Sequence, residues 1–194
     1  MRSPAATLVN LIVIIHAFLS CGLTVFSVIA PYWYDLWPEL GNGGLFVYCF
    51  EDECKTLSGS VYHFIHVTRG FMIMAAAGNF LGFFVLAAAT KCRRKRRIIQ
   101  RVGSSFVLLG GIFAFVSLAT FTVRCTDLPF LPAGLFSYSY SYVLGWVAGA
   151  VSTITGAVSF AFPLPKKCHK TENMVQPRSA PSTDETGLDR NESV

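Results

Sequence analysis

The stretch Val102-Gly-Ser-Ser-Phe-Val-Leu-Leu-Gly-Gly-Ile-Phe-Ala-Phe-Val-Ser-Leu-Ala-Thr-Phe-Thr-Val123 contains no Lys, Arg, Asp or Glu. A helix rises about 1.5 Å per residue, so about 20 apolar residues cross the roughly 30 Å of hydrocarbon in a bilayer. This stretch therefore predicts a membrane-spanning helix. Three more uncharged runs of comparable length lie at 8–30, 70–90 and 142–162.

The overall composition agrees with a membrane protein. Of 194 residues, 53% are hydrophobic and only 14% are charged, which does not suit a soluble globular domain. Backbone polar groups in hydrocarbon must pair internally, and four isolated runs achieve this only as helices. The first run has some features of a cleaved signal peptide, with Ala30 at a small-residue site, but its length and the following Pro31 favour a retained span.

The basic residues predict the orientation, because they accumulate in short cytoplasmic loops. Of 16 Lys and Arg, only Lys55, Arg69 and Arg124 fall in the connections 31–69 and 124–141. We therefore expect both termini in the cytoplasm and these two loops outside. The outer loops then hold six acids against three bases, a net charge of −3. The overall charge of +5 thus reflects topology and anionic lipid, and gives no support for nucleic-acid binding.

The cysteines divide by compartment under this topology. Cys49 and Cys54 fall in the oxidising first loop, close enough in sequence for a hairpin disulfide. A ring this small contributes only about 2 kcal/mol by loop entropy, so it sets local geometry more than it stabilises the bundle. Two free thiols, or a pairing with Cys125, remain as alternatives.

The residues around these cysteines predict a small antiparallel sheet. Aromatic and β-branched runs occur at 31–37 and 45–50, and the glycine-rich turn 41–44 separates them. We expect the strand from Leu45 to Phe50 to pair with a strand that follows Cys54. Six aromatic residues flank the spans at the predicted outer interface, where such rings prefer to sit: Trp33, Tyr34, Trp37, Tyr138, Tyr140 and Trp146.

These loop residues carry a resemblance to a known family. Trp33, Gly44-Leu45-Phe46, Cys49 and Cys54 resemble the signature of the superfamily that contains claudins, peripheral myelin protein, epithelial membrane proteins and lens fibre membrane intrinsic protein. The first departure is Phe46, where the signature has a second Trp. The second is the short Cys49–Cys54 spacing, which is similar to the lens fibre branch.

The resemblance continues into the spans. Thr68-Arg69-Gly-Phe-Met resembles the family's entry to the second span, and the segment from Tyr138 to Gly145-Trp146 resembles its entry to the fourth. The similarity covers about 8–168. In this family the residue that matches Arg69 links the loop to the helices, and we consider Glu51, Asp52 and Glu53 as its partners.

The resemblance implies a claudin-like fold, an all-α left-handed bundle of four transmembrane helices that carries a small extracellular antiparallel sheet. It also implies a plasma-membrane or junctional protein without enzymatic activity or cofactor, which self-associates and contacts a like or related four-span protein on the facing cell. One alternative is a paracellular barrier or pore, in which the acidic cluster Glu51–Glu53 favours cations. Another is an accessory or trafficking subunit of a channel or secretory granule.

Several polar features within or beside the spans have modest explanations. His63 and His66 share a helix face, but no third ligand has the spacing of a zinc site. Three polar side chains inside spans are expected to face the bundle and hydrogen-bond between helices: Asn10, His16 and Asn79. Gly78-x-x-x-Gly82 and Gly145-x-x-x-Gly149 are expected to permit close helix packing within the bundle.

The cytoplasmic segments suggest contacts with lipid. The connection between the second and third spans contains a basic run that would attract anionic lipid: Arg93, Arg94, Lys95, Arg96 and Arg97. Cys92 and Cys168, near the membrane surface, are candidate palmitoylation sites. The membrane domain is expected to span 1–168, and the polar tail 169–194 to be disordered. The terminal Glu192-Ser-Val194 is only a weak match to a PDZ ligand, because it lacks Ser or Thr two residues before the end.

Overall fold

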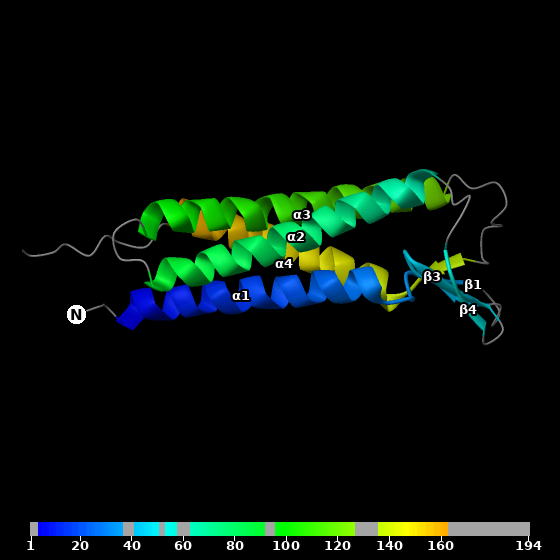
Figure 1. Ribbon diagram of the computed structural model, residues 1–194, viewed down its shortest axis with the longest axis horizontal. Helices are drawn as coiled ribbons and strands as arrows, with labels where there is room; N and C mark the ends of the chain where they lie inside the picture. The colour runs from blue at the N-terminus through cyan, green and yellow to red at the C-terminus, as the bar shows by residue number, and fades with distance from the viewer. Residues whose placement is uncertain are drawn as a thin grey trace, which may run out of the picture.

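Four long helices run side by side in the computed structural model of the chain (Figure 1). They are α1 (Pro4–Ile29), α2 (His63–Lys91), α3 (Arg96–Thr126) and α4 (Tyr140–Ala161). The structure describes residues 4–36, 41–50, 53–57, 63–91, 96–126 and 136–162. Each of the four helices is long and apolar enough to cross a membrane, which confirms the four predicted spans.

The helices of the second and third spans are longer than their uncharged runs. α2 begins at His63 and α3 extends from Arg96 to Thr126, so both reach into segments that the sequence placed in connections. The charges in these extensions lie at the helix ends, outside the uncharged central stretch. A span boundary marks where the hydrocarbon ends, and a helix need not end there.

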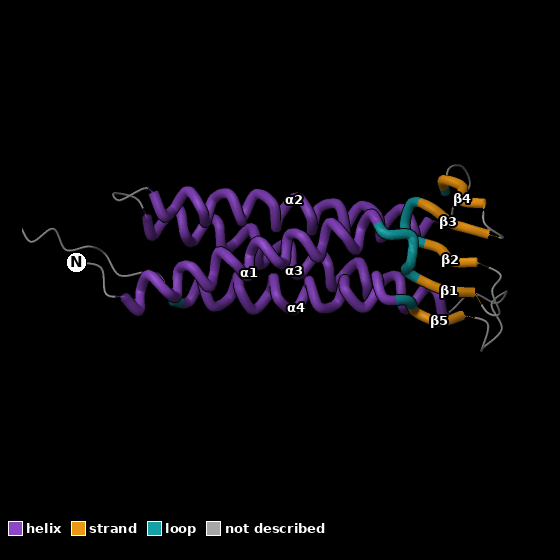
Figure 2. The backbone as a smooth tube through the Cα atoms, turned by 90° about the horizontal axis from the view of Figure 1, so that it is seen from below, coloured by secondary structure: helices purple, strands orange, loops and turns teal. Residues whose placement is uncertain are grey.

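Five short strands form one antiparallel sheet at one end of the bundle, as Figure 2 shows. They are β1 (Tyr34–Leu36), β2 (Gly41–Gly43), β3 (Val47–Phe50), β4 (Glu53–Thr56) and β5 (Phe136–Tyr138). Their order is β4-β3-β2-β1-β5, and all neighbours are antiparallel. The predicted hairpin is confirmed as β3 and β4. The sequence did not reveal that β5, from the second connection, completes the sheet beside β1.

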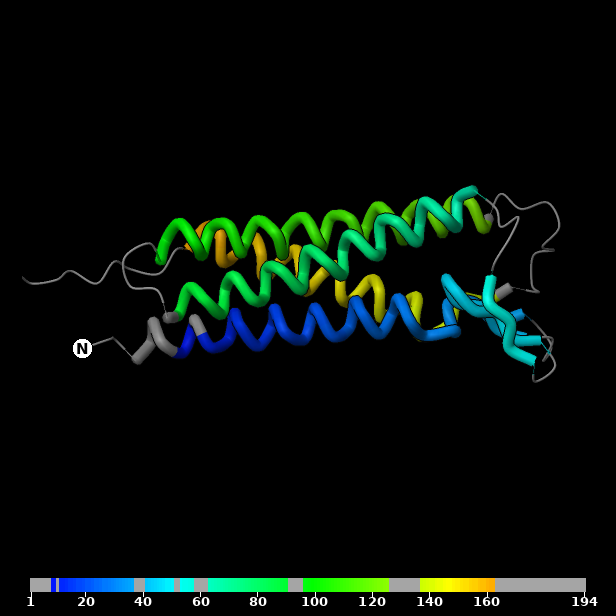
Figure 3. The backbone as a smooth tube through the Cα atoms, in the orientation of Figure 1, coloured from blue at the N-terminus to red at the C-terminus, as the bar shows by residue number. Residues whose placement is uncertain are grey.

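The start of α1 and the end of α4 lie at the end of the bundle opposite the sheet (Figure 3). The colour gradient also shows that successive helices run in opposite directions along the bundle. The two described ends of the chain therefore lie at the same end of the bundle.

Glycines allow the helices to approach closely. A Cβ built on Gly156 of α4 would lie 2.7 Å from the backbone nitrogen of Leu108 in α3. One on Gly78 of α2 would lie 3.2 Å from the Phe106 carbonyl oxygen. The other motif glycines also pack inside the bundle: Gly82 against α3, Gly145 against α1 and α3, and Gly149 against α3. This confirms that both glycine motifs serve packing within the bundle.

Hydroxyl and amide groups connect the helices in the bundle interior. Asn79, 1% exposed, donates from Nδ2 to Thr24 Oγ1 over 3.0 Å, which confirms its predicted orientation. The hydroxyls of Ser20 and Ser152 join α1 to α4. The prediction for His16 is wrong, because its side chain is exposed. Its Nδ1 donates to the Ile12 carbonyl oxygen at 2.8 Å, a partner within its own helix. The Asn10 side chain lies outside the described residues.

We predict that Gly156→Ala lowers the stability of the purified protein, because the new methyl group meets backbone atoms of α3 that have no room to move. Overpacking of this kind costs about 1–3 kcal/mol. The matched control is Gly22→Ala, where nothing lies within 4 Å of the new Cβ. Thermal unfolding in detergent measures both changes. Equal melting temperatures for the two variants would contradict the close α3–α4 packing.

Candidate functional site: the sheet and its anchor on the helices

The side chain of Trp33 is completely buried where the sheet meets the bundle. Its Nε1 donates a hydrogen bond of 2.6 Å to the carbonyl oxygen of Ser27 in the last turn of α1. Its ring meets Phe121 of α3 edge-on with centroids 5.1 Å apart, and Tyr142 of α4 edge-on at 6.1 Å. One indole thus contacts three helices. Of the six aromatic residues that flank the spans, Trp33 is therefore not an interfacial belt residue, because no part of it reaches the surface.

The backbone of Trp33 joins the two connections. Its nitrogen donates to the Gly43 carbonyl oxygen at 2.8 Å, and its own carbonyl oxygen accepts from the Ser139 nitrogen at 3.0 Å. Next to it, the Ser141 nitrogen donates to the Tyr32 carbonyl oxygen at 3.1 Å. The segment before β1 is therefore tied to the segment that enters α4. The sheet is a product of both connections, with Trp33 at their junction.

Gly44 and Leu45 have separate roles in the anchor. A Cβ on Gly44 would lie 2.7 Å from the Ala30 carbonyl oxygen and 2.7 Å from the Pro31 Cα, so no side chain fits at this position. Leu45 is 1% exposed and packs in one apolar cluster with Trp33 and Met72. Gly44 thus allows close approach of the sheet to the end of α1, and Leu45 packs the sheet against the bundle.

Arg69 of α2 binds the sheet through backbone carbonyls. Its Nε donates to the Leu45 carbonyl oxygen at 2.5 Å, and its Nη2 donates to the Leu57 carbonyl oxygen at 3.2 Å. Its guanidinium lies 5.0 Å from the centroid of the Phe46 ring. Phe46 therefore supplies the aromatic face for a cation–π contact, although it departs from the family signature.

The acidic partners predicted for Arg69 do not match this geometry. Glu53 forms an ion pair of 2.8 Å with Lys55, and both side chains are strongly exposed. Glu51 and Asp52 lie outside the described residues. Carbonyl oxygens suit the site better, because a guanidinium presents several donors in a fixed fork and can bridge two strand ends.

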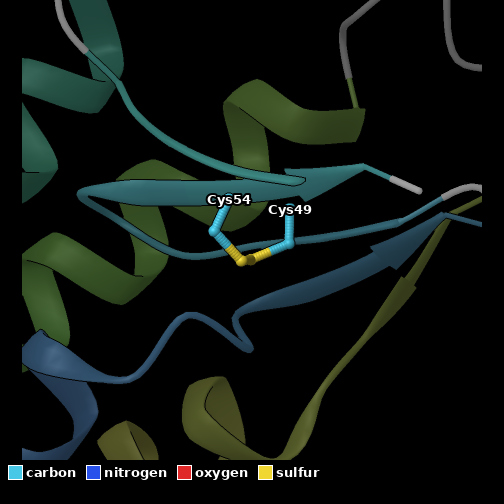
Figure 4. Close-up of a disulfide and its surroundings, with 2 residues drawn as sticks. All are labelled: Cys49 and Cys54. Carbon is cyan, nitrogen blue, oxygen red and sulfur yellow. A yellow bond between two sulfur atoms is a disulfide. The ribbon is translucent and has the colours of Figure 1, made fainter. Parts of the chain in front are cut away.

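The predicted disulfide is confirmed. Cys49 of β3 and Cys54 of β4 are bonded, and they lie directly opposite each other with their Cα atoms 4.0 Å apart (Figure 4). All four residues of β4 are exposed, so little besides the ladder and this bond holds the strand in place. Cys125 is a free thiol near the end of α3, and a pairing with it is excluded.

Two tyrosines of the sheet, Tyr34 and Tyr138, pack against aromatic rings of the helices. Tyr34 of β1 faces Tyr138 of β5 across the ladder, and the Tyr138 ring stacks on Tyr142 with centroids 4.3 Å apart. Burial raises the pKa of Tyr34 above its usual value, and the neighbouring Cys125 thiol raises it further. Burial also raises the pKa of Tyr138, as do Tyr142 and Cys125. Both hydroxyls therefore stay neutral at physiological pH.

The remaining predicted positions are spread over the molecule. Trp146 packs on Phe115 with ring centroids 5.5 Å apart, next to Gly145 in α4. Arg96 and Arg97 begin α3 at the far end from the sheet, where Arg97 is exposed. Five predicted positions lie outside the described residues: Cys92, Arg93, Arg94, Lys95 and Cys168. His63 and His66 are exposed on α2, and no three metal-binding side chains gather anywhere in the described part of the chain.

Sequence reasoning missed the aromatic cluster beneath Trp33. Phe121 is 2% exposed, and the Tyr142 hydroxyl hydrogen-bonds Thr122 Oγ1 at 2.5 Å. Both rings occur near the ends of apolar runs, where an aromatic residue also suits the membrane interface. Only the position of both rings beside Trp33 in the structure shows that they belong to the buried cluster and not to the membrane interface.

The geometry defines a class of protein, in which a membrane-spanning four-helix bundle carries a disulfide-linked antiparallel sheet anchored by a buried Trp and an Arg. Within that class, the chain belongs to the PMP-22/EMP/MP20/Claudin family, whose sequence model matches residues 6–159.

Individual relatives agree with this membership. The chain is 28% identical over 148 residues to the human lens fiber membrane intrinsic protein, covering 72% of this chain and 83% of the relative. It is 25% identical over 168 residues to the mouse lens fiber membrane intrinsic protein, covering 84% of this chain and 94% of the relative.

We predict that Arg69→Lys loosens the sheet from α2, because an ammonium group cannot hold both the Leu45 and the Leu57 carbonyl oxygens in the same fork. The loss of a charged hydrogen bond costs about 2 kcal/mol. Limited proteolysis between β4 and α2 should become faster. The matched control is Phe46→Trp, which keeps an aromatic face under Arg69 and should leave the cleavage rate unchanged. Unchanged cleavage in Arg69→Lys would refute the proposed role of the guanidinium.

We also predict that Cys49→Ser or Cys54→Ser alone reduces delivery to the cell surface more than the double replacement. A single change leaves a reactive thiol, whereas the double change removes only about 2 kcal/mol of loop constraint. Surface biotinylation measures delivery, and the spans should insert in every variant because insertion depends on hydrophobic length. A double mutant that is delivered less well than either single mutant would contradict this explanation.

Proposed function

We propose that this protein is a non-enzymatic multi-pass membrane protein that mediates contact between cells, with the sheet as its adhesive surface. The observation that carries the proposal is a row of exposed aromatic side chains. Phe46, Tyr48 and Phe50 occupy alternate positions in and before β3, so they share one face of the sheet. They are 36%, 38% and 45% exposed.

Exposed aromatic residues on a rigid support suit protein recognition. Tyr and Phe bury a large area with few rotatable bonds, and aromatic residues are enriched in the cores of protein interfaces. The β3–β4 disulfide and the Arg69 contacts hold this face in place before any partner arrives. Little ordering entropy would then be lost on binding.

The proposed orientation places the sheet outside the cell and both termini in the cytoplasm, with the protein in the plasma membrane at junctions. The distribution of basic residues supports this, since 13 of 16 belong to the N-terminus, to residues 91–101 where α2 ends and α3 begins, and to the segment that follows α4. An antibody against a C-terminal tag should therefore stain cells only after permeabilisation. Staining of intact cells would rule out the orientation.

A second copy of this protein, or a related four-span protein, on the facing cell is the proposed partner. Self-association within one membrane and contact with anionic lipid at the basic end of the bundle accompany this proposal. A pore or barrier function has less support, because the Glu53 carboxylate of the acidic cluster is already paired with Lys55.

We predict that the double change Tyr48→Ser and Phe50→Ser removes most of the protein from cell contacts while surface delivery persists. Loss of two aromatic anchors should weaken the contact by about tenfold or more. The assay mixes expressing with non-expressing cells and measures enrichment at their borders. Wild-type protein should gather only where two expressing cells meet.

The matched control is Thr56→Ala in β4. Thr56 lies opposite Val47 in the ladder, so it is exposed on the other face of the sheet. This variant should gather at contacts as the wild type does. Normal enrichment of the aromatic double mutant would refute the adhesive face, and enrichment at borders with non-expressing cells would point to a different partner.

A further inference from the structure

A cavity of about 20 Å³ lies at the end of the bundle opposite the sheet, and all four helices contribute to its wall. Val13 of α1 and Leu86 and Ala89 of α2 form part of its apolar lining. Gln100 of α3 and Ser159 of α4 are polar residues on the same wall. Both are deeply buried, with exposures of 5% and 2%.

The hydroxyl of Ser159 has no hydrogen-bond partner among the described residues. Gln100 Nε2 donates to the Ser159 carbonyl oxygen at 3.1 Å. The Gln100 amide therefore bonds the backbone of Ser159 and not its hydroxyl. The hydroxyl of Ser141, near the start of α4 beside the sheet, also lacks a partner in the part of the chain that the structure describes, but two other buried serines in this bundle differ. Ser104 Oγ donates to the Gln100 carbonyl oxygen at 2.8 Å, and Ser152 Oγ donates to the Ala148 carbonyl oxygen at 2.8 Å.

The size of the cavity limits what it can hold. A cavity of roughly 10–15 Å³ or more accommodates one water molecule, provided that polar groups on the wall can bind it. A buried hydroxyl without a partner loses its hydration without compensation. Val9 and Val158 at the edge of the cavity are 48% and 44% exposed, so the site adjoins the lipid-facing surface.

We propose that this cavity is a binding site for a single hydroxyl oxygen, supplied by a water molecule or by the hydroxyl group of an uncharged lipid. The bound oxygen hydrogen-bonds the Ser159 hydroxyl beside the Gln100 amide. It thereby connects α4 to the other three helices at the end of the bundle opposite the sheet. The site is separate from the sheet and does not depend on the adhesive function.

The test is the sign of the change in melting temperature for Ser159→Ala in the full-length protein. An occupied site predicts that Tm falls by about 3 °C, because the bound oxygen loses a partner. If the site is empty, Tm should rise in Ser159→Ala, because the change removes a buried hydroxyl that has no hydrogen-bond partner. The matched control is Ser104→Ala, whose hydroxyl bonds only within its own helix and whose loss should change Tm little. An unchanged or higher Tm for Ser159→Ala in all three of the preparations described below would overturn the proposal.

A second variant, Ala89→Val, places extra volume in the cavity. It should lower Tm in the wild-type background, where it displaces the bound oxygen, and lower it less in the Ser159→Ala background. Additive effects of the two changes would overturn the site.

Three preparations distinguish the sources of the oxygen: lipid-free detergent, bilayers of phosphatidylcholine alone, and the same bilayers with cholesterol. A Ser159→Ala penalty of equal size in all three identifies water. A penalty only with cholesterol identifies a lipid hydroxyl, and no penalty in any preparation rejects both.

Discussion

The burial of the Trp33 indole is the constraint on which the arrangement of sheet and bundle depends. Its ring contacts α3 and α4, its Nε1 is bound to Ser27 at the end of α1, and its backbone pairs with β2 and with the segment before α4. Loss of a buried Trp typically costs about 3–5 kcal/mol. Here that energy stabilises the position of the sheet relative to the helix bundle. The exposed aromatic row in and before β3 belongs to this sheet, so its position relative to the bundle is fixed as well.

Within the bundle, a different balance applies. Lipid tails are as apolar as the helix surfaces, so burial of apolar area gives little drive for helices to associate. Helix association depends instead on close packing at glycines and on hydrogen bonds between helices. Each such hydrogen bond contributes about 0.6 kcal/mol. The contact between Gly156 and α3 and the Asn79–Thr24 bond are examples of each. A polar group without a partner in this interior, such as the Ser159 hydroxyl, therefore carries information about what else is bound.

The sequence predicted the features that depend on local composition. The absence of charge marked the four spans, and the short separation of Cys49 from Cys54 marked the hairpin disulfide. Features that depend on tertiary contacts were harder to foresee. Nothing near Phe136 in the sequence indicates that β5 pairs with β1. Arg69 was expected to find a carboxylate, but its helix places it beside strand-end carbonyls, whose positions no sequence pattern records.

Hydrogen–deuterium exchange on Trp33→Ala would test the role of this indole most directly. The amides of Trp33, Gly44 and Ser139 all donate to backbone carbonyls in the sheet region, so they report its integrity. If Trp33 anchors the sheet, these amides should lose most of their protection in the variant while amides in the middle of α2 and α3 keep theirs. Retained protection of the sheet amides in Trp33→Ala would show that the sheet holds its place without this side chain and would contradict the account.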